Sequence, residues 1–556
     1  MYFTLAISAA TRQGCSALVE TALGTDPRVL PIPGPAAVAW RAPDERAAVL
    51  RWGLPGDNRS ITSHAGTIWA DAGAVHARTG LARVDPVYLA EVPGAVLICD
   101  RASWAAAVTG RFGDHDPVMV GAFLSMGYPV GSATPFRRAR AVGRDRSLTA
   151  TGGRLVVTSA HDRDARPGRA GGYDPVAAAL VDTVAPLRDA GVQVELSLTG
   201  GKDSRLIAAA LTAAKVPFRA RTHGFASHPD VVIAAMIAAR LGVEHVVTEP
   251  RPPGTGPGPD EADVIRRLRS AVLVSDGMLS AFENVGWPDP QLVSEPVQVG
   301  GHGGELLRGG YATAAWRAGR AARARSEARA PELFRRLTTR RLGLLRPVAA
   351  GEYLASLAPY AAALPRGPLR TLDNFYLVNR AGRWSATARQ GYLMRSPLVQ
   401  PFFGDRVVAA ARAVPLEDRI TDRLHRGVLE VLAPDLIDLP LAGSGWKSGP
   451  KTPALPPAGP GSASAPDWRR NYGDEMARIL RDYALDLGGA GRLFDIVRRP
   501  AAEAVLRPPH ADPEAAWALA TLGALLSGDW LNARGPGGRA PDPVTPSDDN
   551  AGRVPG

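Results

Sequence analysis

A glycine turn between two apolar runs is the feature of this chain best suited to chemistry. Residues 194–198 are apolar and β-biased, residues 199–205 read Thr-Gly-Gly-Lys-Asp-Ser-Arg, and an apolar helical pattern follows. A strand–loop–helix of this kind gathers several backbone N–H groups at the positive end of a helix dipole, which suits the phosphates of a nucleotide. Gly200 and Gly201 allow positive φ angles and a close approach of the backbone to such a ligand.

Two polar side chains complete this loop. Asp203 can hold Mg²⁺ against phosphate oxygens, and Ser204 can cap the helix or contact a phosphate. The pattern is not a Walker A loop, because Leu196 holds the place of the first glycine and Asp203 follows the lysine. It resembles the PP-loop of ATP pyrophosphatases, Ser/Thr-Gly-Gly-x-Asp-Ser. That resemblance implies cleavage of ATP between its α and β phosphates, with AMP passing to a carboxylate or another oxygen.

The elements around the loop are predicted to alternate between strand and helix. Asp174-Pro175 is predicted to be the N-cap and first residue of a helix. Strands are then expected at 192–198, 217–223 and 245–248, with helices at 204–214 and 229–241. This series is typical of an α/β core with a parallel sheet.

The first 170 residues have a different pattern, with short apolar runs separated by Gly, Pro and Asp turns. Gly94–Asp100 and Leu155–Thr158 are the best strand candidates, so a mostly β region is expected. Residues 162–172 form a polar, glycine-containing linker. Residues 314–346 are rich in arginine and are predicted to form a solvated basic helical pair, with an acidic-peptide or nucleic-acid surface as the alternative.

Three further segments resemble the synthetase domain of asparagine synthetases. In the first, Thr222-His223-Gly224-Phe225 is similar to the end of the family's second strand, where a residue contacts adenine. The resemblance assigns that position to His223, and a second, main-chain adenine contact to Leu198. A histidine at a strand end without a ligand is the alternative.

The second segment, residues 299–311, reads Val-Gly-Gly-His-Gly-Gly-Glu-Leu-Leu-Arg-Gly-Gly-Tyr. It resembles the family's Ser-Gly-x-Gly-x-Asp-Glu-x-x-Gly-Gly-Tyr pattern. The resemblance places Gly300 and Gly301 near the nucleotide and Glu305 in place of the metal-binding Asp, and a carboxylate oxygen there suits Mg²⁺. His302 holds the position of the tyrosine base of β-lactam-forming relatives, where an imidazole could remove a proton from an attacking ammonium.

The third segment, residues 439–447, ends in Gly-Trp-Lys and follows Pro401–Arg406 in an order similar to the family's C-terminal half. The resemblance assigns to Lys447 the role of stabilising negative charge on an acyl-adenylate or tetrahedral intermediate, with Lys451 as the alternative. A solvated loop lysine is the other reading.

Departures from the family pattern are equally informative. Glutamine-hydrolysing members carry a catalytic cysteine directly after Met1, whereas this chain has Tyr2, and Cys15 is internal. Residues 120–123 and 134–136 still resemble the glutaminase fold, so a scaffold without glutaminase activity is expected. Leu393 stands where some relatives have the glutamate that pairs with the base.

The resemblance therefore implies an α/β protein of two domains and a tail. Residues 1–172 are expected to form a degenerate glutaminase-like (Ntn) domain, a mostly β sandwich. Residues 173–534 are expected to form an adenine-nucleotide α-hydrolase-like, ATP-binding synthetase domain with a parallel sheet. Residues 535–556 are expected to be disordered.

Composition bounds the compartment and the partners. The 556 residues include only two cysteines and carry a net charge of +11. Two cysteines cannot build a disulfide framework, no run is long and apolar enough to span a membrane, and no signal peptide is recognised, so a cytoplasmic protein is expected. The charge suits phosphate-rich substrates or an acidic peptide, and nucleic acid is not the expected partner.

The predicted function is ATP-dependent amide-bond formation through an acyl-adenylate, with ATP and Mg²⁺ as cofactors. The pattern is most similar to lasso-peptide cyclases, which implies macrolactam closure of a precursor peptide. A leader-peptide-binding protein and a protease are then expected partners. A β-lactam synthetase or an ammonia-dependent asparagine synthetase, acting on a small carboxylate, is the second candidate. A catalytically silent binding homologue is a third, and Asp203 and Glu305 argue against it.

Overall fold

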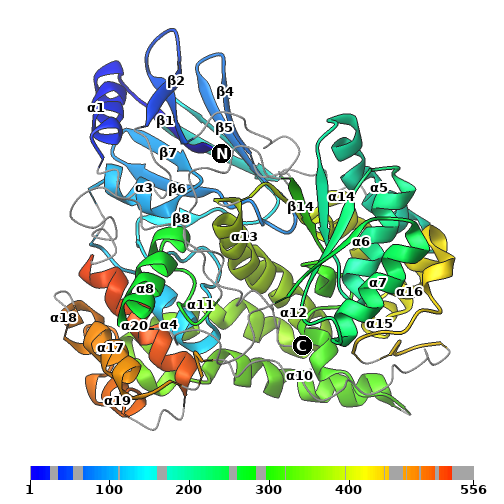
Figure 1. Ribbon diagram of the computed structural model, residues 1–556. Coiled ribbons are helices and arrows are strands. Elements are labelled where there is room, and N and C mark those ends of the chain that lie inside the picture. Colours follow the sequence, from blue (N-terminus) through cyan, green and yellow to red (C-terminus); the bar gives the residue numbers. More distant parts are fainter. Residues whose placement is uncertain are drawn as a thin grey trace.

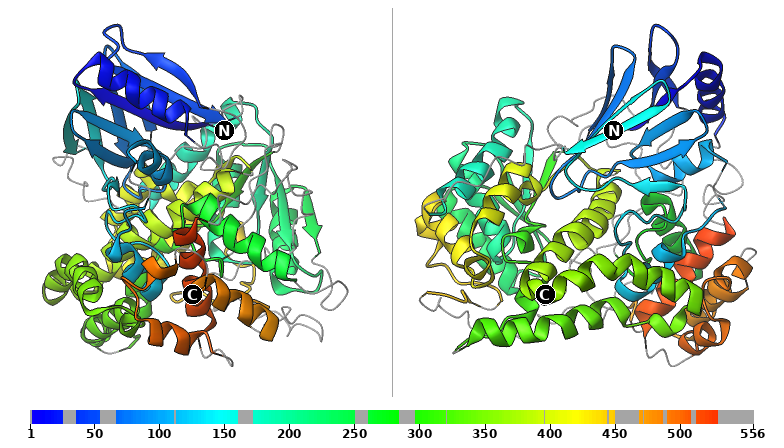
Figure 2. Two further views of the ribbon diagram at one scale, coloured as in Figure 1. Left: turned by 90° about the vertical axis from the view of Figure 1, so that its left-hand side faces the viewer. Right: turned by 180° about the vertical axis from the view of Figure 1, so that it is seen from behind.

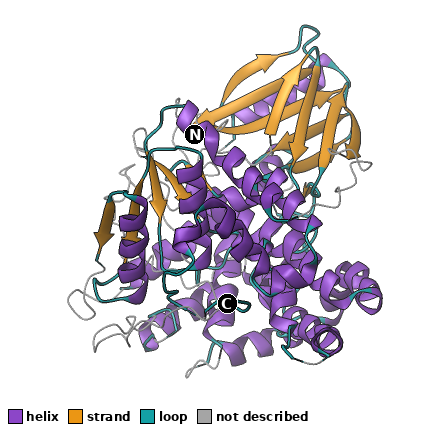
Figure 3. Cartoon of the chain, turned by 90° about the vertical axis from the view of Figure 1, so that its right-hand side faces the viewer, coloured by secondary structure: helices purple, strands orange, loops and turns teal. Residues whose placement is uncertain are grey.

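A computed structural model shows antiparallel sheets at one end, a parallel sheet beside them, and helices filling the rest (Figures 1 and 3). It describes residues 2–25, 36–53, 67–110, 113–159, 172–249, 260–283, 296–319, 321–394, 396–443, 445–449, 468–470, 472–486, 490–507 and 512–528. Lys451, the 162–171 part of the predicted linker and the predicted disordered tail lie outside these ranges. The expected mixture of α and β structure is confirmed.

Two antiparallel sheets make up the N-terminal part, with strand orders β2-β3-β1-β7-β6-β8 and β10-β9-β5-β4. Their bounds are β1 Tyr2–Ala9, β2 Ala37–Arg41, β3 Ala47–Gly53, β4 Thr67–Asp71, β5 Ala74–Thr79, β6 Tyr88–Val92, β7 Ala95–Cys99, β8 Ala139–Ala141, β9 Arg146–Thr151 and β10 Arg154–Ser159. Val96 and Ile98 of β7 share an apolar cluster with β5 and β9 of the other sheet. Leu97 and Cys99, on the opposite face, join a separate and larger core.

That larger core extends from the N-terminal sheet into the C-terminal helices, since it contains both Phe3 and Leu526. The helices that contribute to it include α1 Arg12–Leu23, α3 Ala102–Val108, α4 Pro117–Met126, α8 Glu261–Ser275, α17 Asp474–Leu485 and α20 Pro513–Ser527. Figure 1 shows α8, α4 and α20 below the β8 edge of this sheet. The strand predicted at 94–100 is thus buried on both faces, which explains its unbroken apolar sequence.

A parallel sheet of five strands, in the order β13-β12-β11-β14-β15, lies beside this part. Its strands are β11 Val194–Ser197, β12 Arg219–His223, β13 His245–Thr248, β14 Val297–Gly300 and β15 Leu398–Val399. Helices α5 Asp174–Asp189, α6 Lys202–Ala213, α7 Pro229–Leu241, α14 Asp405–Ala413 and α16 Arg423–Leu432 bury their apolar faces in the same core. Glu195 ties three strands together through Arg219, Arg221 and Gln298.

The predicted series of strands and helices is confirmed from residue 174 onward, with small shifts at its boundaries. Helix α6 begins at Lys202 rather than at residue 204, because Gly201 takes the N-cap position. Helix α5 begins at Asp174 itself, and Tyr173 is its N-cap.

The arginine-rich segment is one helix, not the predicted pair. Helix α10 covers Ala322–Thr339, between the short α9 Tyr311–Ala315 and the 3₁₀ turn η3 Leu342–Leu344. Its buried face carries Ala330 and Phe334, which join the larger core, while most of its arginines are exposed. The segment is therefore an amphipathic helix with a charged outer face.

One run among the remaining helices connects the two cores (Figure 2). A nearly continuous helical run, which comprises α12 Pro368–Phe375, the π-helix η5 Tyr376–Ser385 and α13 Ala386–Leu393, passes between them. The others are η2 Gly304–Leu306, α11 Pro347–Ala363, η4 Leu364–Arg366, η6 Pro401–Phe403, α15 Leu416–Ile420, η7 Pro434–Leu436, α18 Ala490–Leu493 and α19 Arg499–Val505. Within the described ranges, no helix has the length and apolar character needed to cross a lipid bilayer.

Candidate functional site

The predicted site residues gather at the carboxyl ends of three adjacent strands. Ser197, the last residue of β11, pairs with Arg221 of β12 on one side and with Gly300 of β14 on the other. The chain adds β12 and β13 on one side of β11 and later returns to add β14 on the opposite side. Ligands of open parallel sheets bind outside the carboxyl ends of strands at such a switch point.

The PP-loop, residues 198–204, is held in a compact turn by its own hydroxyl groups. The Thr199 amide donates to Ser204 Oγ (3.1 Å), and the Gly201 amide donates to Thr199 Oγ1 (3.2 Å). Ser204 therefore closes the loop rather than capping α6. Helix α6 has no side-chain cap at Gly201. The first N–H groups of the helix are consequently available to an anion.

The two glycine-rich loops touch one another closely. A Cβ atom on Gly301 would lie 2.7 Å from the Ser204 amide nitrogen, and one on Gly304 would lie 2.2 Å from the Asp203 Cγ atom. Real Cβ atoms do not come this close to other heavy atoms, so both positions require glycine. The resemblance placed Gly301 near the nucleotide, and in the structure it lies against the N-terminal end of α6.

Asp203 lies at the centre of a charged cluster. Its Oδ2 atom is 2.7 Å from Arg308 Nη2, and its Oδ1 atom is 2.9 Å from His425 Nε2. Burial raises the pKa of Asp203, but Arg308, His425 and Lys202 outweigh it and hold the pKa below its ordinary value. The carboxylate is therefore ionised at neutral pH, as a metal or phosphate site requires.

Glu305 is the second carboxylate of the site. Its Oε1 atom lies 3.7 Å from the same Arg308 nitrogen that contacts Asp203, and its Oε2 atom is buried with no hydrogen-bond partner among the described residues. Among the described residues, no group of three or more His, Cys, Asp and Glu side chains could hold a metal. Mg²⁺ at nucleotide sites commonly takes only one or two carboxylates plus phosphate oxygens, so Asp203 and Glu305 fit this ion.

Asp422 joins the PP-loop to the loop that carries Lys447. Its Oδ2 atom accepts hydrogen bonds from Lys202 Nζ (2.7 Å) and from the Lys447 amide (3.2 Å). The residue is fully buried, has a left-handed φ of 63°, and keeps its Oδ1 atom without a partner. A non-glycine residue in this conformation is strained, and such strain is concentrated at functional sites.

Lys447 itself lies beside this junction. Its Nζ atom donates to the Ile420 carbonyl at 3.1 Å. Partial burial lowers the pKa of Lys447, Asp422 opposes that effect, and Lys202 and Arg308 add to it. The structure thus brings Lys447 to the cluster through Asp422.

His302 lies on the loop that follows β14, three residues before Glu305. Its Nε2 atom is 3.0 Å from Ser385 Oγ, and its ring centroid is 5.7 Å from those of Trp384 and Phe403. Burial lowers the pKa of His302, while Glu305 opposes that shift. The imidazole is therefore neutral at pH 7, the form that a general base needs.

The two predicted adenine-contacting residues stand on adjacent strand ends. The Leu198 amide donates to the Arg221 carbonyl (2.9 Å), and its carbonyl accepts from Thr222 Oγ1 (2.8 Å). A new main-chain contact to Leu198 would therefore use the second lone pair of its carbonyl oxygen. His223 is the last residue of β12 and is half-buried.

The sequence predictions missed Arg308, Asp422 and His425. Arg308 lies in the segment already singled out, but the family pattern leaves its position open. Asp422 and His425 come from the start of α16, more than 200 residues beyond the PP-loop. Their spacing of three residues, one helical turn, was the only local signal, and it is common on ordinary helices.

Comparison with known proteins agrees with the PP-loop half of this site. The family model described as asparagine synthase matches residues 175–253, which hold α5 to β13 and include Asp203 and His223. A comparison of the chain with curated proteins found no match. The family match supports a relation to asparagine synthetase-like proteins and, in general terms, an ATP-dependent ligase that forms amide bonds.

Proposed function

We propose that the protein activates a carboxylate with ATP and passes the acyl group to an amine, releasing AMP and pyrophosphate. The observation that carries this proposal is the close contact of the two glycine-rich loops, which places the carboxylates of Asp203 and Glu305 beside one guanidinium group, that of Arg308. The free N–H groups of α6 would hold phosphates. Mg²⁺, held by the two carboxylates, would neutralise phosphate charge.

Each nearby side chain has a role in this reaction. Lys202 and Lys447, both tied to Asp422, would stabilise negative charge that develops on the acyl and phosphate oxygens. His302, neutral and on the same loop as Glu305, would accept the proton of the attacking amine. The proton acceptor and the cations thus come from different loops, as the two ends of a tetrahedral intermediate require.

The acyl acceptor is proposed to be the N-terminal amine of the substrate peptide itself, so that the product is a macrolactam, as in lasso-peptide cyclases. Support comes from the sequence resemblance and from the absence of an apparent nucleophile for glutamine hydrolysis. The chain's two cysteines, Cys15 and Cys99, are both buried, and burial raises the pKa of each thiol. A buried thiol of raised pKa is a poor nucleophile.

The adenylation step can be tested by ATP–pyrophosphate exchange with the full chain, Mg²⁺ and a panel of acidic peptides. Exchange and AMP as the nucleotide product are expected. Release of ADP and phosphate would contradict the acyl-adenylate route. Loss of one water from a peptide that has a free N-terminal amine, shown by mass spectrometry, would establish cyclisation.

A small carboxylate, as in β-lactam synthetases and ammonia-dependent asparagine synthetases, is the second candidate substrate. The position of His302, where β-lactam-forming relatives have a base, favours it. Exchange supported by free amino acids but by none of the peptides would decide for this candidate. A glutaminase assay should show no glutamate release in either case.

A further inference from the structure

Arg380 is a half-buried arginine that packs against an aromatic side chain. It belongs to the π-helix η5, and its guanidinium carbon lies 3.5 Å from the centre of the Trp384 ring and 5.7 Å from that of Tyr128. No hydrogen bond or ion pair joins its guanidinium to another residue in the described part of the chain. Segments of π-helix are rare and occur frequently at functional sites.

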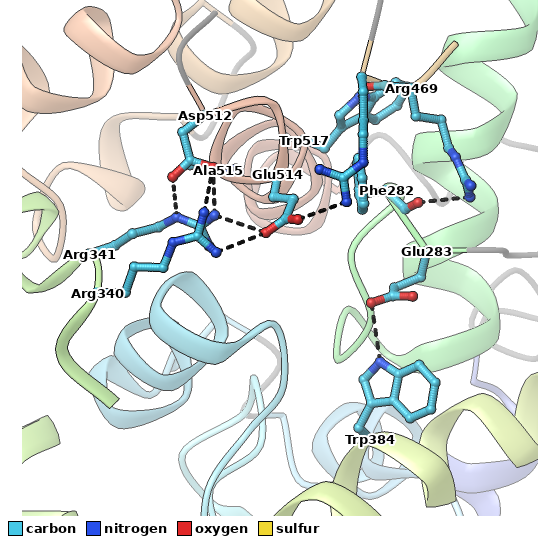
Figure 4. Close-up of polar contacts among 11 residues, drawn as sticks. Phe282, Glu283, Arg340, Arg341, Trp384, Arg469, Asp512, Glu514, Ala515 and Trp517 are labelled. Atoms are coloured by element: carbon cyan, nitrogen blue, oxygen red, sulfur yellow. Dashed lines mark hydrogen bonds and ion pairs between the residues drawn. The ribbon is translucent and has the colours of Figure 1, made fainter. Parts of the chain in front are cut away.

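The Arg380–Trp384 pair lies beside His302. Trp384 lies 5.7 Å from the His302 ring, and the next residue, Ser385, bonds His302 directly. Trp384 is itself fixed, because its Nε1–H donates to Glu283 Oε1 at 3.3 Å (Figure 4). The indole ring is therefore a fixed platform on which the guanidinium stacks.

The pair also lies where the N-terminal part meets the helices around the parallel sheet. Tyr128, just beyond α4, bonds Tyr311 through their hydroxyl groups at 2.6 Å, and Arg380 stacks near the Tyr128 ring. Binding sites occur preferentially at such junctions. A guanidinium on an aromatic platform, with its planar set of N–H donors unused, is suited to a carboxylate held by two parallel hydrogen bonds.

We propose that Arg380, stacked on Trp384, is a binding subsite for a carboxylate of the acyl donor. This inference rests on the proposed function and adds the substrate group that the site recognises. The carboxylate has two possible sources: an Asp or Glu side chain within a peptide, or the α-carboxylate of a free amino acid. Both present the same planar pair of oxygens to Arg380.

Binding without turnover tests the subsite. The full chain is saturated with Mg²⁺ and α,β-methylene ATP, which cannot be cleaved between its α and β phosphates. It is then titrated calorimetrically with the N-acetyl N-methylamides of aspartate and glutamate, with free L-aspartate, and with L-asparagine. Binding of the blocked residues identifies a peptide side chain, whereas binding of L-aspartate and L-asparagine alone identifies an α-carboxylate.

Arg380→Met should weaken binding of the carboxylate probe about 10- to 100-fold, the usual loss for a hydrogen-bonded charge. Arg380→Lys keeps the positive charge but lacks the paired N–H donors of a guanidinium, so it should bind the probe more tightly than Arg380→Met and more weakly than the wild type. Arg370→Met is the matched control, because Arg370 is exposed on α12 and lines a separate surface pocket with Arg366. It should bind the probes as the wild type does.

Two results would overturn the subsite: no carboxylate probe binds the wild type, or a probe binds Arg380→Met and the wild type equally. Affinity for the ATP analogue should be unchanged in every variant, which separates this subsite from the nucleotide site. Pyrophosphate exchange by the wild type decides the proposed function independently. If the protein binds carboxylates at this subsite but shows no ATP–pyrophosphate exchange, only the proposed chemistry is refuted.

Discussion

Two charged clusters in this molecule have similar composition but differ in how completely their polar atoms are paired. In the cluster around Asp512, Arg341 donates two bonds of 2.6 Å to that carboxylate and a third to Glu514 (Figure 4). A fourth bond goes to the Leu124 carbonyl. In the cluster around Asp203, four buried side-chain atoms have no hydrogen-bond partner among the described residues: Glu305 Oε2, Arg308 Nε, Asp422 Oδ1 and His425 Nδ1.

The difference separates a structural cluster from a reactive one. Buried polar groups are nearly always paired, so each exception calls for an explanation. The Arg341 cluster joins the end of α10 to the start of α20 and to α4. Its fully paired polar groups hold these helices together, which is a structural role. The Asp203 cluster lies on two glycine-rich loops and contains buried polar atoms without hydrogen-bond partners among the described residues. This is the arrangement expected of a site that binds a cation and phosphates.

The largest effect is expected from Asp203→Ala. Loss of the central carboxylate removes both a metal ligand and the partner of Arg308, so pyrophosphate exchange should fall on the order of 10³-fold or more. The matched control is Asp182→Ala on α5, which removes an exposed carboxylate paired with Arg406. If Asp203→Ala retains pyrophosphate exchange, the cluster with unpaired polar atoms is not the reactive one.

His302→Ala should slow amide formation about 10²- to 10⁴-fold, the range for general bases, and should partly spare exchange. Because burial lowers the pKa of His302 from 6.5, the neutral form persists below that pH. The acid limb of amide formation should therefore lie below pH 6.5. Rates of product formation measured by mass spectrometry across this range check the prediction, and an unchanged limb in His302→Ala would place the base elsewhere.

Substitutions at Asp422 separate its charge from its backbone conformation. Asp422→Asn and Asp422→Gly both tolerate the left-handed φ angle, but both remove the charge that holds Lys202 and the Lys447 loop. Each should raise the KM for ATP in the exchange assay about 10- to 100-fold. Asp422→Ala should in addition destabilise the fold by about 1 kcal/mol. If Asp422→Asn has the kinetics of the wild type, the charge of Asp422 is not needed for the reaction and the residue serves only the backbone turn.

The Asp512 cluster should affect stability and not activity. Burial raises the pKa of Asp512, but the hydrogen bonds and charge of Arg341 outweigh it and hold the pKa below 3.8. A depressed carboxyl pKa contributes stability above the unfolded-state pKa, and that stability is lost as the pH falls through the folded-state value.

Asp512→Asn should therefore lower the thermal midpoint at neutral pH and flatten its fall in acid, while it retains the helix cap of α20. Melting curves from about pH 6 to pH 3 measure this, since the unfolded Asp titrates near 3.9. Exchange rates equal to those of the wild type are expected, and a loss of exchange would show that this cluster also serves the reaction.

Local sequence was sufficient for strands β11, β12 and β13 of the parallel sheet and for the PP-loop, since both depend on short apolar runs and on glycine. It did not predict strands β14 and β15. The 229–241 helix was predicted with its bounds, because Pro229 starts it and Gly242 ends it in a left-handed cap. The family pattern also led correctly to the β14 loop, which packs on Asp203. Whether the predicted residues act as assigned stays a prediction.

The rest could not be read locally. The arginine-rich sequence from 314 to 346 suggested two helices. The structure has one, and its packing depends on the burial of Ala330 and Phe334 against distant elements. Asp422 acquires its importance only when folding brings α16 over the PP-loop. The sequence around Arg380 is ordinary. The π-helix that places Arg380 against Trp384 cannot be recognised from the spacing of apolar residues.

The core shared by the N-terminal sheet and the C-terminal helices has a consequence for how such a chain can evolve. One face of β7 packs against the same apolar cluster that contains Trp517 of α20. Deleting the N-terminal part would leave this wall of the helical region open to water, with an apolar surface prone to aggregation. The N-terminal part would therefore be retained by selection for solubility even without chemistry of its own, and its sequence would be most constrained along that face.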